Sequence, residues 1–403
     1  MTKKLRVGIL FGGRSGEHEI SLRSAASVLY AIDKKKYEVV PVGITKQGRW
    51  VLGGEADRLL NGDAPSAGSL VAEAATSKQA AGWKDASLAP ATNATALHSP
   101  GLHSPGLQFS GLQSPGLQFS GHAEALGVDV VFPVLHGTFG EDGTMQGLLE
   151  LAGKAYVGSG VLGSAAGMDK DVMKRLFAAA KLPIVKHVTL LRGDWHDSPK
   201  KAIGRVEAAL KYPLFVKPAN LGSSVGISKA HDRSELGPAI DLAASYDRKI
   251  VVEQGVGGKG GKKARELEVA VLGNDRPEAS VVGEIVPGKE FYDYEAKYES
   301  DSSVPIIPAK LTRDQSKRIR QMAIDAFKAC DCAGLARVDF LMGPGKSGRL
   351  YLNEINTMPG FTSISMYPKL WEASGLRYSE LIDRLIQLAL ESRAEKDETH
   401  YSR

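Results

Sequence analysis

Three oxygen-bearing side chains, those of Asp339, Glu354 and Asn356, stand on two apolar runs on either side of a glycine-rich turn. Side chains alternate across a strand, so a hairpin over these runs brings Asp339 and Glu354 together on one face. Two carboxylates among apolar neighbours repel each other unless a cation lies between them. Oxygen ligands suit Mg²⁺, which commonly also binds substrate phosphates. The pattern predicts a magnesium site, and a solvent-facing polar stripe is the weaker alternative.

A lysine ends another apolar run. Lys217 closes the run that begins at Pro213, and the glycine-serine loop 222–226 follows it. A buried lysine is costly unless an anion pairs with it, and glycines leave backbone N–H groups free to line a phosphate. Such a loop alone is most often an ordinary turn. Combined with the acidic hairpin, it favours phosphate binding.

Glu17 and His136 each follow a strand pattern in the first part of the chain. A carboxylate there suits an ammonium group, although a lone acid before a helix is more often a cap. A histidine in a turn is about as often hydrogen-bonded within the protein for structural reasons as it is functional. Ligands of parallel sheets bind at the carboxyl ends of the strands, so the shared position favours a binding role for both.

These residues need elements to position them. The first section alternates strands at 5–11, 38–44 and 128–135 with a helix at 21–32, which indicates a parallel α/β layer. A second section predicts helices at 170–180 and 199–210 and strands at 213–217 and 249–253. The last predicts strands at 266–272, 279–286, 337–342 and 349–356, a helix with a Thr312–Gln315 capping box ending near Gly334, and a helix at 379–390 before a fraying tail.

The pattern dissolves between residues 53 and 122. Five consecutive pentads occupy 97–121, and each contains glycine or proline. Neither a long helix nor a central strand persists through such interruptions. We expect a variable surface insertion that carries no chemistry.

Composition excludes several classes of protein. The 403 residues suggest two or three domains. The 51 basic and 46 acidic residues leave a net charge of +5 without a basic block, which argues against nucleic-acid binding. No apolar run approaches the ~20 residues of a membrane helix, and the start has no apolar signal core. We expect a cytoplasmic protein that needs no membrane.

Several stretches together resemble the D-alanine–D-alanine ligase family of the ATP-grasp superfamily. They are FGGRSGEHEIS (11–21), VFPVLHGTFGEDGTMQG (131–147), GSGVLGSAAGMDK (158–170), FVKPANLGSSVGISK (215–229), FYDYEAKY (291–298), ARVDF (336–340) and YLNEINTMPGFTSISMYP (351–368). The resemblance implies an α/β fold: an N-terminal parallel α/β domain (1–158) followed by a two-domain ATP-grasp fold of α+β type (159–256 and 257–392) and a tail (393–403).

The resemblance also implies how ATP and metal are held. Lys170 and Lys217 would bind the phosphates of ATP. Two Mg²⁺ or Mn²⁺ ions would be held by Asp339, Glu354 and Asn356. The adenosine contacts would come from Glu253, Gln254, Val256 and Glu266. Gln254 stands where a lysine is frequent, and residues 257–263 lengthen the next loop, so the adenine contacts depart from the family pattern.

Further residues would handle two D-alanine molecules. The implied triad is Glu17, Ser223 and Tyr298, with Glu17 holding the first ammonium group. Arg337 and the N–H of Gly360 would stabilise the tetrahedral oxyanion. The remaining substrate contacts would come from His136, Lys297, Ser365 and Met366. Residues 287–305 would form a loop that closes over the site.

The implied activity is ATP-dependent ligation of two D-alanine molecules through a D-alanyl phosphate, for peptidoglycan precursors, in a homodimer. The nearest alternative is a D-alanine–D-lactate ligase, which we rank second because Tyr298 matches the dipeptide-forming type. A ligase for another amino acid follows. A nucleotide-binding sensor without turnover ranks last, because such a protein should have lost part of the metal set or Arg337.

Overall fold

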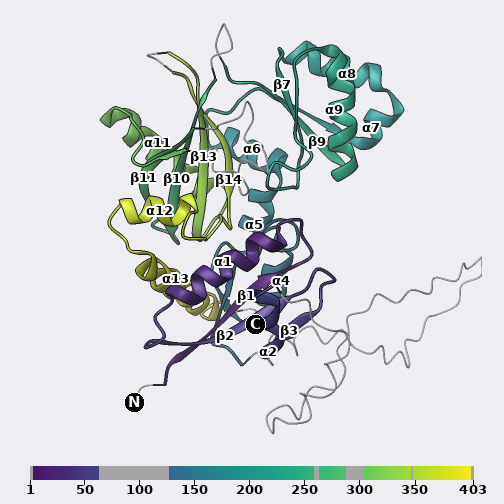
Figure 1. Cartoon of the computed structure of the whole chain (residues 1–403). Helices are drawn as coiled ribbons and strands as arrows, with labels where there is room; N and C mark the ends of the chain where they lie inside the picture. Colours follow the sequence, from purple (N-terminus) through teal and green to yellow (C-terminus); the bar gives the residue numbers. More distant parts are fainter. Residues whose placement is uncertain (1–2, 63–126, 258–262, 287–303, 346–347, 401–403) are drawn as a thin grey trace, which may run out of the picture.

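The computed structural model describes residues 3–62, 127–257, 263–286, 304–345 and 348–400. Within these residues three β-sheets carry the fold, each covered by helices (Figure 1). None of the helices in these ranges is long and apolar enough to cross a membrane. The pentads at 97–121 lie wholly outside the described ranges. The expected closing loop at 287–305 also lies outside them, except for residues 304–305.

The first sheet has the strand order β3-β2-β1-β4-β5. Pairs β1–β2, β1–β4 and β4–β5 are parallel, whereas β3 is antiparallel to β2. The elements of this layer are β1 (Leu5–Gly12), α1 (His18–Ala31), β2 (Tyr37–Ile44), β3 (Trp50–Leu52), α2 (Gly54–Leu60), β4 (Val130–Pro133), α4 (Thr144–Leu151) and β5 (Ala155–Tyr156). The predicted parallel α/β layer is confirmed.

Both faces of this sheet are buried, which explains why β1 reads as a continuous apolar run. Val7, Ile9 and Phe11 pack with α1 and the C-terminal helix, whereas Leu10 packs with α4 on the opposite face. Since α1 leads from β1 to β2 on one side and β4 pairs with β1 on the other, the strand order reverses at β1. The carboxyl ends of β1 and β4 therefore form a ligand-binding crevice.

The second sheet is antiparallel, in the order β6-β9-β7-β8, and its core is closed by α7, α8 and α9. Two helices connect it to the first layer. The elements are α5 (Val161–Met168), α6 (Lys170–Ala179), β6 (His187–Leu191), α7 (Arg192–Asp197), α8 (Pro199–Ala209), β7 (Leu214–Pro218), β8 (Ser228–Ala230), α9 (Arg233–Tyr246) and β9 (Lys249–Gln254).

The third sheet is also antiparallel, in the order β12-β11-β10-β13-β14. Helix α11 packs on one face, and α12 and α13 pack on the other (Figure 1). The elements are β10 (Arg265–Gly273), β11 (Glu278–Val286), β12 (Val304–Ile306), α11 (Arg313–Ala329), β13 (Gly334–Met342), β14 (Leu350–Asn356), α12 (Met366–Ala373) and α13 (Tyr378–Asp397). The predicted capping box at Thr312 and Gln315 is present.

One hydrophobic core joins the first and third sheets. Leu381, Leu385 and Ile386 of α13 are fully buried in the same cluster as Phe11 of β1 and Leu335 of β13. The end of the chain thus packs on its beginning. Burying apolar surface between the two layers fixes their relative position, and with it the distance between the β1 crevice and the β13–β14 hairpin.

Three expectations about boundaries were wrong. The first part of the expected insertion is ordered, because Ala56 and Leu59 of α2 are buried in the core that covers the first sheet. Helix α11 ends at Ala329 instead of near Gly334. The C-terminal helix does not fray after Ser392 but continues to Asp397, since Lys396 pairs with Glu150 in the first domain.

Candidate active site

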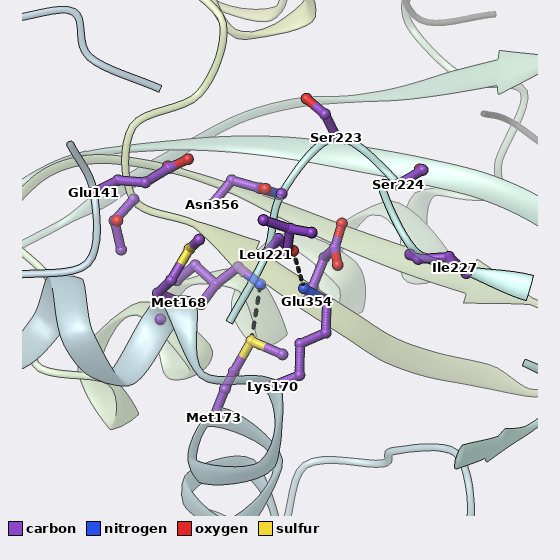
Figure 2. A pocket seen from close by; sticks show the side chains of 14 residues that line it. Glu141, Met168, Lys170, Met173, Leu221, Ser223, Ser224, Ile227, Glu354 and Asn356 are labelled. Carbon is purple, nitrogen blue, oxygen red and sulfur yellow. Dashed lines mark hydrogen bonds between the residues drawn. The ribbon is translucent and has the colours of Figure 1, made fainter. Parts of the chain in front are cut away.

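One pocket collects side chains from several elements (Figure 2). It is lined by Lys170 of α6, Ser223 of the loop after β7, Glu354 and Asn356 of β14, and Glu141 of the loop before α4. The predicted acidic hairpin therefore faces the predicted phosphate-binding loop. Lysine and carboxylate side chains from distant parts of the chain thus line one pocket. The binding of phosphate and of a metal ion requires such a combination of charges.

The hairpin has the predicted arrangement. Asp339 and Glu354 are directly paired across β13 and β14, and the amide of Asn356 donates to Asp339 Oδ2 at 3.0 Å. The guanidinium of Arg337 donates to both oxygens of Asp339, at 2.8 and 2.7 Å. The Arg337 guanidinium thus offsets the charge of Asp339. The donor set of two carboxylates and one amide oxygen fits Mg²⁺ or Mn²⁺.

No group of three or more His, Cys, Asp or Glu side chains among the described residues is arranged to hold a metal ion. The predicted set differs from such a group, because its third member is an amide. Glu268 on β10 also reaches this region, with Oε2 at 3.2 Å from Nε of Arg337. Sequence reasoning missed Glu268, although it lies two residues from the predicted Glu266 and on the same face of its strand.

A buried charge cluster underlies the expected phosphate site. Glu253 on β9 is 3% exposed, and its two oxygens lie 2.8 Å from Nζ of Lys174 and 2.8 Å from Nζ of Lys217. Lys174 also donates to the carbonyl of Asn353 on β14. The sequence motifs did not indicate Lys174. Its place one turn after Lys170 on the same helix face was the available signal.

Electrostatics keep this cluster ionised. Burial opposes the charge of Glu253, but Lys174 and Lys217 outweigh it and hold the pKa of this carboxyl below its usual range. Burial likewise opposes the charge of Lys217, whereas Glu253 and Glu354 raise its pKa. Lys217 therefore stays cationic in a nearly dry position, which suits an anionic ligand.

The loop after β7 has a constrained backbone. Ser223 and Ser224 adopt positive φ values of 47° and 59°, and Gly226 follows at 71°. Non-glycine residues rarely adopt this conformation, and such strain persists mainly at functional sites. The ammonium of Lys170 donates to the carbonyl of Leu221 at 2.7 Å and so holds the loop from beneath.

Glu17 and Ser223 meet as the resemblance implied. The Ser223 hydroxyl donates to Oε1 of Glu17, joining the first sheet to the loop after β7. A Cβ on Gly137 would lie 2.5 Å from Glu17 Oε2, and one on Gly222 would lie 3.0 Å from it. Both glycines are needed to admit the carboxylate. Tyr298, the third member of the expected triad, lies outside the described residues, as does Lys297.

A second carboxyl group stands beside Glu17. Glu141 accepts from the backbone N–H of Gly137 at 2.7 Å. Burial and the charge of Glu17 raise the pKa of Glu141 to about 8. The N–H of Gly137 and the charge of Lys170 lower this pKa, but by less. Sequence reasoning missed Glu141. Its position in the same strand-end loop as His136 was the signal that could have found it.

His136 lies at the carboxyl end of β4, where it was expected, and is 4% exposed. Its Nδ1 lies 3.1 Å from the carbonyl oxygen of Met358, and its Nε2 lies 3.0 Å from Oγ of Ser24. Both ring nitrogens thus contact protein. Burial lowers the pKa of His136 to about 4, so the ring is neutral at physiological pH.

The turn after β14 carries the remaining substrate-site residues. Gly360 lies against Ser365, whose hydroxyl accepts from the N–H of Thr362 at 3.1 Å. Met366 begins α12, and its side chain is packed in the hydrophobic core. A substrate contact from Met366 would therefore have to come from its backbone.

Of the expected adenosine contacts, Glu253 belongs to the lysine cluster, and the other three lie at or next to the ends of β9 and β10. Glu266 is half-buried on β10 and close enough to raise the pKa of Lys217. The side-chain oxygen of Gln254 accepts from the backbone N–H of Lys211 at 3.1 Å. Val256 is half-exposed and lies close to Gly343 of the hairpin.

The sequence matches two family models. Residues 6–159 match the D-ala D-ala ligase N-terminus, and residues 176–387 match the D-ala D-ala ligase C-terminus. Together these matches span most of the chain and cover each of the three sheets.

Similar proteins carry the same family name. A D-alanine–D-alanine ligase of Natranaerobius thermophilus is 46% identical over 395 residues, covering 98% of this chain and 97% of that protein. One of Chloroherpeton thalassium is 48% identical over 396 residues, with 98% and 99% covered.

Solved structures of ligases are similar to this chain as well. The D-alanine–D-alanine ligase of Coxiella burnetii matches with a TM-score of 0.73 and 36% identity, covering 98% of this chain and 97% of that one. The VanG D-Ala:D-Ser ligase of Enterococcus faecalis matches with a TM-score of 0.72 and 34% identity, covering 96% and 100%. This chain belongs to the D-alanine–D-alanine ligase family.

Proposed function

We propose that this protein joins two D-alanine molecules to D-alanyl-D-alanine with hydrolysis of ATP to ADP and phosphate. The observation that carries the proposal is the pocket that brings Lys170, Ser223, Glu354 and Asn356 together. It combines cationic, backbone and carboxylate groups for a nucleotide with Glu17 for an ammonium group, which lies next to Ser223. The product would serve peptidoglycan synthesis in the cytoplasm, and we expect a homodimer.

In the first step Lys170 and Lys217 bind phosphates of ATP, and Glu17 binds the ammonium group of the first D-alanine. An oxygen of that substrate's carboxylate attacks the γ-phosphorus, and ADP leaves, which produces D-alanyl phosphate. Asp339, Glu354 and Asn356 would hold Mg²⁺ or Mn²⁺, which supplies charge neutralisation for phosphoryl transfer. Arg337 donates to both oxygens of Asp339 and offsets its charge.

In the second step the amine of the second D-alanine attacks the carbonyl carbon of the acyl phosphate. The carbonyl oxygen becomes an oxyanion, which Arg337 and the N–H of Gly360 stabilise. The C–O bond then breaks, phosphate leaves with the bonding electron pair, and the triad of Glu17, Ser223 and Tyr298 would take up the proton that the amine loses. Ser365 and Lys297 would orient the carboxylate of the second substrate, and Glu17, Ser223 and Tyr298 would position its amine.

The test is an assay with ATP, Mg²⁺ and D-alanine. We expect phosphate and D-alanyl-D-alanine in equal amounts, with no product from L-alanine alone. D-Lactate and D-serine are supplied as second substrates in parallel reactions. A depsipeptide or a mixed dipeptide formed faster than D-alanyl-D-alanine would contradict the proposed second substrate, and activity with L-alanine alone would contradict the proposal as a whole.

A further inference from the structure

A buried serine lies behind the turn that presents Gly360. Ser24 belongs to α1, is fully buried, and lies far in sequence from the β14 turn. Its Oγ accepts from the backbone N–H of Phe361 at 3.4 Å and lies 3.0 Å from Nε2 of His136. In the reaction described above, neither Phe361 nor His136 takes part in a chemical step.

The directions of these hydrogen bonds follow from the groups themselves. The carbonyl of Met358 can only accept, so Nδ1 of His136 carries the hydrogen that reaches it at 3.1 Å. A neutral imidazole then accepts at Nε2, and burial keeps this ring neutral by lowering its pKa to about 4. Ser24 must therefore donate its O–H to His136 while accepting from Phe361.

The chain of hydrogen bonds encloses the peptide group of interest. It anchors the carbonyl of Met358 and the N–H of Phe361, and only Pro359 and Gly360 lie between these two points. Proline fixes its own φ, which leaves the Gly360 peptide little freedom. The carbonyl of Phe361 is held in addition by the hydroxyl of Tyr378 at 2.6 Å. The turn is thus held from α1, from the loop after β4 and from α13.

We propose that Ser24 is a positioning residue for the ligation step, because its hydroxyl, together with His136, fixes the Met358–Phe361 turn and so the direction of the Gly360 N–H. This role rests on the proposed function, in which that N–H stabilises the oxyanion of the second step. Phosphoryl transfer in the first step does not use the Gly360 N–H. Loss of the Ser24 hydroxyl should therefore slow the second step selectively.

The experiment compares Ser24→Ala with Ser27→Ala, a serine one turn further along the same helix that donates only to the carbonyl of Arg23. Dipeptide synthesis measures the whole reaction. Transfer of an isotopic label from the bridging to the non-bridging oxygens of the β-phosphate of ATP, with D-alanine present, measures reversible phosphoryl transfer alone. Thermal unfolding is recorded for each variant.

For Ser24→Ala we expect dipeptide kcat to fall about tenfold, the effect of weakening one oriented hydrogen bond, while label transfer and KM for ATP stay close to wild type. Ser27→Ala should leave all of these unchanged. Equal losses in synthesis and label transfer would indicate a merely structural role and overturn the inference, as would unchanged synthesis.

If Ser24→Ala does not fold, Tyr378→Phe supplies the same comparison, since it removes only the hydroxyl that holds Phe361. A selective loss of synthesis supports the inference, and an equal loss of both activities contradicts it. A wild-type protein that makes no D-alanyl-D-alanine would instead refute the proposed function, so the two failures are distinguishable.

Discussion

Replacement of Lys174 by methionine tests the buried charge cluster most directly. The Lys174 side chain is 1% exposed and the Glu253 side chain is 4% exposed, with 2.8 Å between the ammonium nitrogen and one carboxylate oxygen. Methionine retains much of the volume of lysine but removes the charge. The buried carboxylate of Glu253 would keep Lys217 as a partner but lose one of the two lysines that neutralise its charge.

Removing one member of a buried ion pair typically costs about 3–5 kcal/mol, because the other charge stays buried without its partner. Since Lys217 still compensates Glu253, we expect the lower end, about 3 kcal/mol. ATP binding should weaken as well, because Lys217 would then be held more strongly by Glu253 and would be less available to phosphate.

The assay is urea unfolding of the ligand-free protein, together with a titration of ATP binding. Arg175→Met is the matched control, because Arg175 is the next residue of α6, its side chain is 72% exposed, and it pairs with Asp171 one turn away. Asp171 is buried, but without Arg175 it keeps Lys249 at 3.5 Å and the hydroxyl of Thr189 at 2.7 Å. Loss of the exposed arginine should therefore cost at most about 1 kcal/mol. A Lys174→Met variant that lost no more stability than the Arg175→Met control would refute the reasoning.

Three further predictions concern Glu354, His136 and the pentad segment. Glu354→Gln should reduce phosphate release on the order of 100-fold while leaving the melting temperature unchanged; near-normal turnover would remove Glu354 from the metal site. His136 has a folded pKa of about 4 against an ordinary 6.5, so the unfolded state binds more protons and stability should fall as pH drops from about 6.5 to about 4; His136→Gln should flatten that dependence in unfolding curves recorded across this range. Deletion of residues 97–121 should leave activity and melting temperature nearly unchanged, because loop closure entropy varies slowly with length; a large fall in either would contradict the expected lack of chemistry there.

Local patterns determined much of the fold. The apolar run of β1, the capping box of α11 and the hairpin at 334–356 are each visible in a few neighbouring residues. Alternation along the two hairpin strands predicted that Asp339 and Glu354 share one face. The structure adds a register shift between Asp339 and Phe340, and this shift is what places Glu354 directly opposite Asp339.

Contacts between distant segments could not be derived in this way. Glu253 was expected at the adenine, and only the tertiary structure revealed that both of its oxygens pair with lysines from α6 and β7. Likewise, the raised pKa of Glu141 depends on burial and on Glu17, more than a hundred positions away in the sequence.

The sequence by itself determined which residue types were available, their spacing along each strand or helix, and the family that these motifs resemble. Only the tertiary structure decided which side chains share a dry environment, and therefore that Ser24, His136 and Phe361 form one hydrogen-bonded unit. Periodicity specifies which face of an element is apolar. Which other element packs against that face depends on the packing of the whole chain, and short-range patterns do not encode this packing.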